Sequence, residues 1–154
     1  MEMQTTPAAE NTNALKAWLS DCAFAELKAA NTIATNGIRT LTVQQRQRLA
    51  EQCVHEMPAD GTIGYAMRRQ EAINRMEAMR RIYLRDTIRH LRHAHKLIQM
   101  TLNLMSVEQK NAWAIANERS GIVCEGVTRA HQRLEVLAKF EELKPTLYPE
   151  QVAA

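Results

Sequence analysis

The chain has few of the residues that build sheets, tight turns and crosslinked frameworks. Aromatic residues make up 5% of its 154 residues, and glycine and proline together number only nine. Strands favour aromatic and β-branched residues, whereas helix interiors exclude glycine and proline, so this composition predicts an all-α protein. With 45% apolar residues, the chain can bury a core without metal or disulfides.

Cysteines are few and poorly spaced for covalent or metal crosslinks. Cys22, Cys53 and Cys124 are widely separated, which gives neither a disulfide framework nor the paired spacing of a zinc site. No apolar run approaches the ~18 residues of a membrane span. The polar residues 1–12 also lack the apolar stretch of a secretion signal. We therefore expect a cytoplasmic protein without membrane contact.

Signatures of catalysis and of cofactor binding are missing as well. The sequence contains no G-x-S-x-G, H-E-x-x-H, G-x-G-x-x-G or phosphate-loop pattern. We therefore expect a protein that is not an enzyme and needs no cofactor.

What the sequence does contain is helical periodicity, beginning with two helices in its first third. Apolar residues recur at helical spacing over residues 13–34, and Asn36-Gly37 is a typical helix stop. Thr42 and Gln45 have the spacing of a capping box, in which each side chain bonds the backbone N–H of the other residue. A second helix is therefore expected over residues 43–57.

Two longer helical patterns follow, over residues 62–104 and 107–143, and Ser106 with Gln109 repeats the capping-box spacing between them. The apolar residues of the second pattern alternate in steps of three and four, which favours packing along another helix. We expect an elongated antiparallel helical hairpin with the two shorter N-terminal helices packed on it, a fold of the helical-bundle type. The predicted limits are a disordered tail at 1–12, a single helical domain at 13–144 and a loose tail at 145–154.

Five basic side chains line up opposite the apolar stripe of the first long pattern. Their spacing of 4, 4, 3 and 4 residues defines what we call the basic row: Arg81, Arg85, Arg89, Arg92 and Lys96. Residues 68–96 hold nine Arg or Lys and three Asp or Glu, although the whole chain carries only +3. This asymmetry predicts a small regulator or adaptor that binds an acidic protein. The alternative is a sequence-nonspecific nucleic-acid-binding protein that uses the same row.

A homodimer is expected, because a long hairpin has more apolar surface than two short helices can cover. Arg80 falls within the apolar stripe, so we expect it to pair with a carboxylate at the subunit interface. Arg69, near the helix start, is expected to reach solvent, either where the stripe is not covered or by extending its charge around the stripe. The other predicted interface residues are Trp113, Val123, Val127, Leu134 and Leu137.

Asp86, His90 and His93 stand at i, i+4 and i+7 on one sector of the predicted helix. Two imidazoles and a carboxylate at this spacing could converge on a divalent transition metal. The surrounding arginines would repel a cation, and no fourth ligand is apparent. We therefore predict no metal and interpret the histidines as surface groups that are protonated near neutrality.

Two short segments share a further pattern. Residues 41–45 (LTVQQ) resemble the LTxxQ element of small periplasmic helical stress chaperones and metal-resistance sensors, and residues 105–109 (MSVEQ) resemble a degenerate second copy. The resemblance covers ten residues, and helix-start chemistry explains both segments equally well. Since the secretion signal expected of that family is missing, no function is transferred from it.

Overall fold

The computed structural model describes residues 7–53, 61–122 and 127–151, and all regular structure within them is helical. The prediction of an all-α helical bundle is therefore confirmed. None of the helices in these residues is long and apolar enough to cross a membrane. The elements are α1 (Pro7–Thr40), α2 (Val43–Gln52), α3 (Gly61–Met79), α4 (Leu84–Leu104), α5 (Val107–Arg119), α6 (Val127–Leu147) and the short 3₁₀ helix η1 (Pro149–Gln151).

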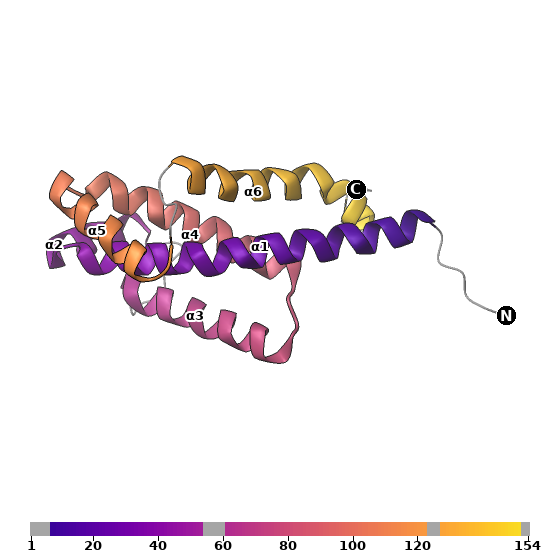
Figure 1. Ribbon diagram of the computed structural model, residues 1–154, viewed down its shortest axis with the longest axis horizontal. Helices are drawn as coiled ribbons and strands as arrows, with labels where there is room; N and C mark the ends of the chain where they lie inside the picture. Colours follow the sequence, from indigo (N-terminus) through magenta and orange to yellow (C-terminus); the bar gives the residue numbers. More distant parts are fainter. Residues whose placement is uncertain (1–6, 54–60, 123–126, 152–154) are drawn as a thin grey trace.

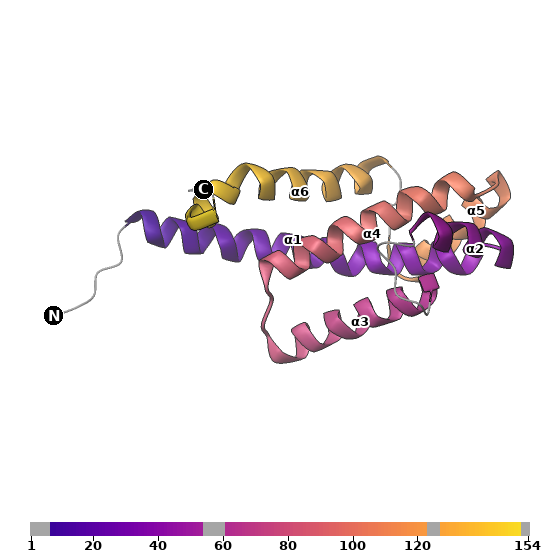
Figure 2. The same ribbon diagram turned by 180° about the vertical axis from the view of Figure 1, so that it is seen from behind.

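The 34-residue helix α1 is the spine of the bundle (Figure 1). Helix α4 packs along it and runs in the same direction, while α3 and α6 run the opposite way on opposite sides of α1 (Figures 1 and 2). The short helices α2 and α5 gather at the end of α1 where that helix stops. The N-terminal helix is thus the longest element and not one of two short helices laid on a hairpin.

The predicted continuous helix over residues 62–104 is wrong, because the chain leaves the helix after Met79 and starts α4 at Leu84. Arg80 adopts a left-handed φ of 52°. Its N–H donates to the Glu77 carbonyl at 3.1 Å, and the N–H of Arg81 donates to the Met76 carbonyl at 3.0 Å. This pair of bonds is a Schellman motif. The break was hidden because arginine occupies the position that usually holds glycine.

The second long pattern is also divided, so the predicted antiparallel hairpin of two long helices does not form. Helix α5 ends at Arg119, and Gly121 follows with φ 85°. The Gly121 N–H donates to the Glu118 carbonyl and the Ile122 N–H to the Asn117 carbonyl, both at 3.0 Å. This is the same motif as at Arg80, here with the customary glycine. Helix α6 then returns along α1.

The first helix passes straight through Asn36-Gly37, which had been expected to stop it. A Cβ atom on Gly37 would lie 2.9 Å from Nε1 of Trp113. That indole nitrogen donates a hydrogen bond of 2.9 Å to the Ile33 carbonyl of α1. The glycine therefore serves the close approach of α5 and not helix termination. The helix also begins earlier than the expected residue 13, at Pro7, a residue well suited to a first helical turn.

The C-terminal segment is packed where a loose tail was expected. Helix α6 continues through Pro145 to Leu147, and the Leu147 side chain is buried. The Tyr148 ring contacts the Phe140 ring edge-on, with the centroids 6.4 Å apart. These apolar contacts hold the chain on the bundle up to the beginning of η1.

Both predicted capping boxes are confirmed, and they bind each other. Gln45, which caps α2, and Gln109, which caps α5, exchange two amide hydrogen bonds of 2.9 and 2.6 Å. Gln45 Nε2 also donates to the Leu104 carbonyl at 2.7 Å, and Gln109 Nε2 donates to the Thr40 carbonyl at 3.3 Å. We call this arrangement the glutamine clasp. Each of these hydrogen bonds made by Gln45 has an equivalent made by Gln109, as if the two capping boxes were related by a two-fold axis.

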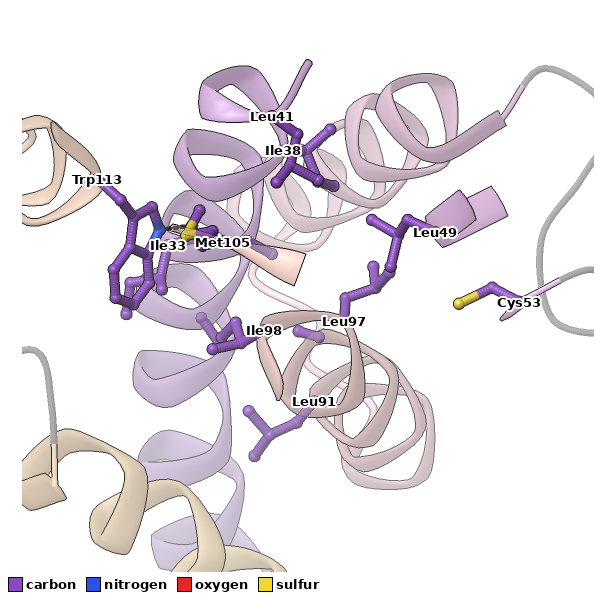
Figure 3. Packing of buried hydrophobic residues seen from close by; sticks show 13 residues of the cluster. Ile33, Ile38, Leu41, Leu49, Cys53, Leu91, Leu97, Ile98, Met105 and Trp113 are labelled. Carbon is purple, nitrogen blue, oxygen red and sulfur yellow. Dashed lines mark hydrogen bonds between the residues drawn. The ribbon is translucent and has the colours of Figure 1, made fainter. Parts of the chain in front are cut away.

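The clasp exposes an internal repeat. Gln45 and Gln109 are 64 residues apart, and the same offset relates α1–α2–α3, the first half, to α4–α5–α6, the second half. Matched positions share one apolar core, in which Trp113 reaches α1 from α5 and Leu49 points inward from α2 (Figure 3). The buried pairs at this offset include Leu27 and Leu91, Ile33 and Leu97, Leu41 and Met105, Leu49 and Trp113, and Arg69 and Arg133.

The internal repeat does not extend to one of the contacts between helices. Helix α6 packs closely on α1, whereas the equivalent pair, α3 and α4, hardly touch. Helix α3 instead leans on α1, where Phe24, Leu27 and Ile73 form a small apolar cluster. The space between α3 and α4 is consequently left as a surface groove.

Candidate functional site

A groove of about 400 Å³ lies between α3 and α4 beside the turn that joins them. Its walls carry the three guanidinium groups of Arg75, Arg81 and Arg89 and one carboxylate, Asp86. Met79 and Tyr83 also line it, and each is 55% exposed. We call this surface the α3–α4 groove. It combines excess positive charge with exposed apolar side chains.

The basic row is distributed over the turn and one helix. Arg81 lies in the turn after α3, while Arg85, Arg89, Arg92 and Lys96 lie on α4, and all five are exposed. The row is therefore not carried by one unbroken rod, although four of its members share one helix.

Several charges of the row already contact groups of the same chain. The guanidinium carbon of Arg85 lies 3.8 Å from the centre of the Tyr148 ring. Arg89 approaches Asp86 at 3.4 Å, and Arg92 pairs with Glu141 of α6. Exposed pairs of this kind contribute at most about 1 kcal/mol each, so a partner can exchange them at little cost.

The groove takes in only part of the predicted row and adds a residue that was not predicted. Arg81 and Arg89 line the groove, whereas Arg92 is turned to Glu141 on α6. Arg75 joins them from α3. It was missed because it falls opposite α4 only once the chain reverses at residues 80–83.

A buried guanidinium lies just beyond the inner end of the groove. Arg69 of α3 is 2% exposed, and its Nε donates to Oδ1 of Asn31 on α1 at 2.5 Å. The Tyr65 ring centre lies 5.1 Å from its guanidinium carbon. Both terminal nitrogens are enclosed and have no hydrogen-bond partner among the residues that the structure describes. The expectation that Arg69 extends to solvent is thus wrong.

Burial lowers the pKa of Arg69 to about 10, with the Tyr65 hydroxyl acting in the opposite direction. The group therefore stays positively charged at neutral pH. A buried charge without a carboxylate or a full set of hydrogen bonds is costly, which makes this position unusual in a protein core.

His90 of α4 closes the inner end of the groove and does not behave as a surface histidine. Its Nδ1 is buried without a hydrogen-bond partner. Burial, assisted by the charges of Arg89, Arg69 and His93 and opposed by Asp86, lowers its pKa to about 4. The imidazole is therefore neutral at pH 7, contrary to the expectation of protonation near neutrality.

The three residues considered as a weak metal site have separate partners. Asp86 pairs with Arg89, His90 faces the Arg69 charge, and Nδ1 of His93 shares a 2.5 Å hydrogen bond with the Tyr65 hydroxyl. Within residues 7–53, 61–122 and 127–151, no group of three His, Cys, Asp or Glu side chains is placed to hold a metal ion.

The predicted dimer residues do not form one surface. Arg80 is in the α3–α4 turn, and Trp113 is 7% exposed inside the single chain. Leu137 packs against the core, while Val127 and Leu134 are exposed on α6. Val123 lies outside the described residues.

An equivalent groove of about 470 Å³ lies between α1 and α6. Glu26 occupies in it the position that His90 has in the α3–α4 groove, and it forms an ion pair of 3.4 Å with Arg129. Arg133, the counterpart of Arg69, is buried and donates from Nε to Nδ1 of His95 at 3.2 Å. One groove is therefore lined by arginines and the other contains carboxylates.

Comparison of the chain with protein-family models, with curated proteins and with solved structures gave no match.

Proposed function

We propose that the protein is a small non-enzymatic adaptor or regulator that binds an acidic protein surface through the α3–α4 groove and the adjoining basic row. The observation that supports this most directly is the composition of the groove. Arg75, Arg81 and Arg89 outnumber the single carboxylate there, beside exposed Met79 and Tyr83. Arginine, methionine and tyrosine are the residues enriched in protein–protein interfaces.

Nucleic acid is the less favoured partner. A protein that tracks phosphates presents a row of cations free to release counterions. Here Asp86, on the same helix as most of the row, and Glu141, on α6, already pair with Arg89 and Arg92. The exposed apolar side chains of the groove are better suited to a partner that has apolar groups of its own.

Fluorescence anisotropy can test this proposal with three labelled probes: an acidic peptide containing Leu and Tyr, a neutral peptide of the same length, and a DNA duplex. We expect the acidic peptide to bind, and the combined Arg75→Glu, Arg81→Glu and Arg89→Glu substitutions to weaken it at least tenfold. Arg39→Glu, Arg48→Glu and Arg119→Glu together make a matched control, since these arginines are exposed elsewhere. Preferential binding of the duplex with a steep salt dependence would favour the alternative function, and binding of neither charged probe would refute both.

We further propose that the protein forms a homodimer through the outer face of α6, where Val127 and Leu134 are exposed. Light scattering at micromolar concentration should give twice the chain mass, and Leu134→Lys should give the single mass. A wild-type monomer would exclude this assembly. The proposed location is the cytoplasm, a reducing compartment in which the thiol of Cys22 would persist.

A further inference from the structure

Two residues, at the inner end of the α3–α4 groove and just beyond it, carry polar atoms that lack partners. Among the described residues, neither the enclosed terminal nitrogens of Arg69 nor the enclosed Nδ1 of His90 has a hydrogen-bond partner. Two helices contribute these groups, since Arg69 lies on α3 and His90 on α4. A buried cation and an imidazole nitrogen without such partners form an incomplete site.

The α1–α6 groove contains a group that the α3–α4 groove does not. The Arg69–Asn31 and Arg133–His95 hydrogen bonds each join residues 38 positions apart, so the two buried arginines occupy matched places. Helix α1, which faces Arg133, carries the carboxylate of Glu26, which pairs with Arg129 one helical turn before Arg133. Helix α4, which faces Arg69, has neutral His90 at the position of Glu26. Among the described residues, the α3–α4 side therefore has no carboxylate at this position.

We propose that the inner end of the α3–α4 groove binds one carboxylate group of a ligand between the terminal nitrogens of Arg69 and Nδ1 of His90. The fork of a guanidinium matches the two oxygens of a carboxylate. A neutral imidazole can donate from Nδ1 when that nitrogen carries the proton. This site does not depend on the acidic-protein proposal, because a free carboxylic acid and an Asp or Glu side chain offer the same group.

The residues around Arg69 and His90 indicate how a carboxylate ligand would reach them. The hydrogen bond between Tyr65 and His93 bridges α3 and α4 on the side away from the turn, so the ligand enters from the groove. Arg75, Arg81 and Arg89 line that entrance and attract anions. Because α3 and α4 hardly touch, a small separation of the two helices admits the carboxylate.

The first experiment uses the wild-type chain with ¹⁵N-labelled arginine. Sodium acetate replaces sodium chloride at constant ionic strength, while the Arg69 Nε–H resonance and the thermal unfolding midpoint are followed. We expect a saturating shift of that resonance and a rise of roughly 2–4 °C in the midpoint. An acetate response no larger than that of chloride, or one that never saturates, would overturn the proposal.

A second titration distinguishes the source of the carboxylate. Glutamate blocked at both backbone ends serves as the probe for a protein side chain. Tighter binding than acetate points to a side chain of a protein partner, whereas tighter binding of acetate points to a free acid. Both outcomes support a carboxylate site.

Substitutions test whether the acetate effect arises at Arg69 and His90. Arg69→Gln should abolish the acetate effect, whereas its structural twin, Arg133→Gln, should retain it. His90→Glu supplies the carboxylate that Glu26 provides at the matched position of α1, so it should raise the midpoint without acetate and remove the acetate effect. An acetate response that persists in Arg69→Gln would place the anion elsewhere and refute the site. The wild-type titration decides the matter even if a variant fails to fold.

Discussion

The two halves of the chain share one backbone plan but differ in how they pair their buried polar groups. At the glutamine clasp, the side-chain amide of each glutamine, Gln45 or Gln109, donates a hydrogen bond to the side-chain oxygen of the other. At the buried arginines the halves diverge, since Glu26 stands on one side and His90 on the other. From this contrast we infer that the hydrogen bonds which both halves make in the same way are those that maintain the fold. The unpaired groups mark the place where a ligand is expected.

The largest effect should come from the shared core. Trp113→Ala removes the indole and its bond to Ile33, and we expect a loss of about 3–5 kcal/mol in the free energy of unfolding. Leu49→Ala at the matched position should cost about 2–4 kcal/mol. Urea denaturation measures both, with exposed Val43→Ala as the control. A large loss at only one position would show that the halves do not contribute equally.

The clasp should show coupling between the halves. Gln45→Ala and Gln109→Ala each remove a capping bond and the bonds across the repeat, so each should cost about 1–2 kcal/mol. The double variant should lose less than the sum, with a coupling of ~1 kcal/mol in a double-mutant cycle. Strict additivity would mean that the two corners act independently.

Acid should destabilise the protein through His90 of α4. Its pKa is about 4 in the folded protein and 6.5 without the fold, so between these values the unfolded chain binds a proton that the folded chain does not. Stability should therefore fall as the pH drops from about 6.5 to 4. For this partly exposed group we expect a loss on the order of 1 kcal/mol. Urea midpoints at pH 7 and 4.5 measure the loss, and His90→Asn should reduce it. An equal loss in that variant would assign the acid sensitivity to other groups.

The smallest effect concerns the two Schellman motifs. Arg80 adopts a left-handed φ that glycine accepts more readily, so Arg80→Gly should stabilise the protein by ~0.5–1 kcal/mol. Gly121→Ala should destabilise it by ~1 kcal/mol, because Gly121 has the same handedness and no atoms nearby to favour a side chain. Thermal unfolding of the two variants should show shifts of opposite sign, and shifts of the same sign would contradict the strain argument.

Local chemistry predicted some elements well. Both capping boxes follow from side chains three residues apart, so Thr42 with Gln45 and Ser106 with Gln109 could be assigned without knowledge of the fold. The helix break at Arg80 could not, because the motif there lacks its usual glycine. The prediction of a helix stop at Gly37 was wrong because the residue that requires a glycine there, Trp113, lies on a helix distant in sequence.

The candidate site was predictable only in part. The concentration of arginine on residues 81–92 pointed to the region in which the groove lies, and Arg81 and Arg89 line it. The burial of Arg69 and the neutrality of His90 depend on the packing of α3 beside α4, which helical periodicity does not specify. One signal was present in the sequence: the offset between residues 41–45 and 105–109 also connects Arg69 with Arg133.

Because the two halves share one core, neither half can bury its apolar residues alone if the backbone is cut between them. Ile33 and Leu97, like Leu49 and Trp113, come from different halves but lie in the same buried cluster. If the backbone were cut at residues 80–83, each fragment would keep one side of every such pair and expose it to water. Two copies of one fragment would then carry self-complementary faces. The single chain is in this sense built like a two-subunit assembly, with residues 80–83 joining the two parts.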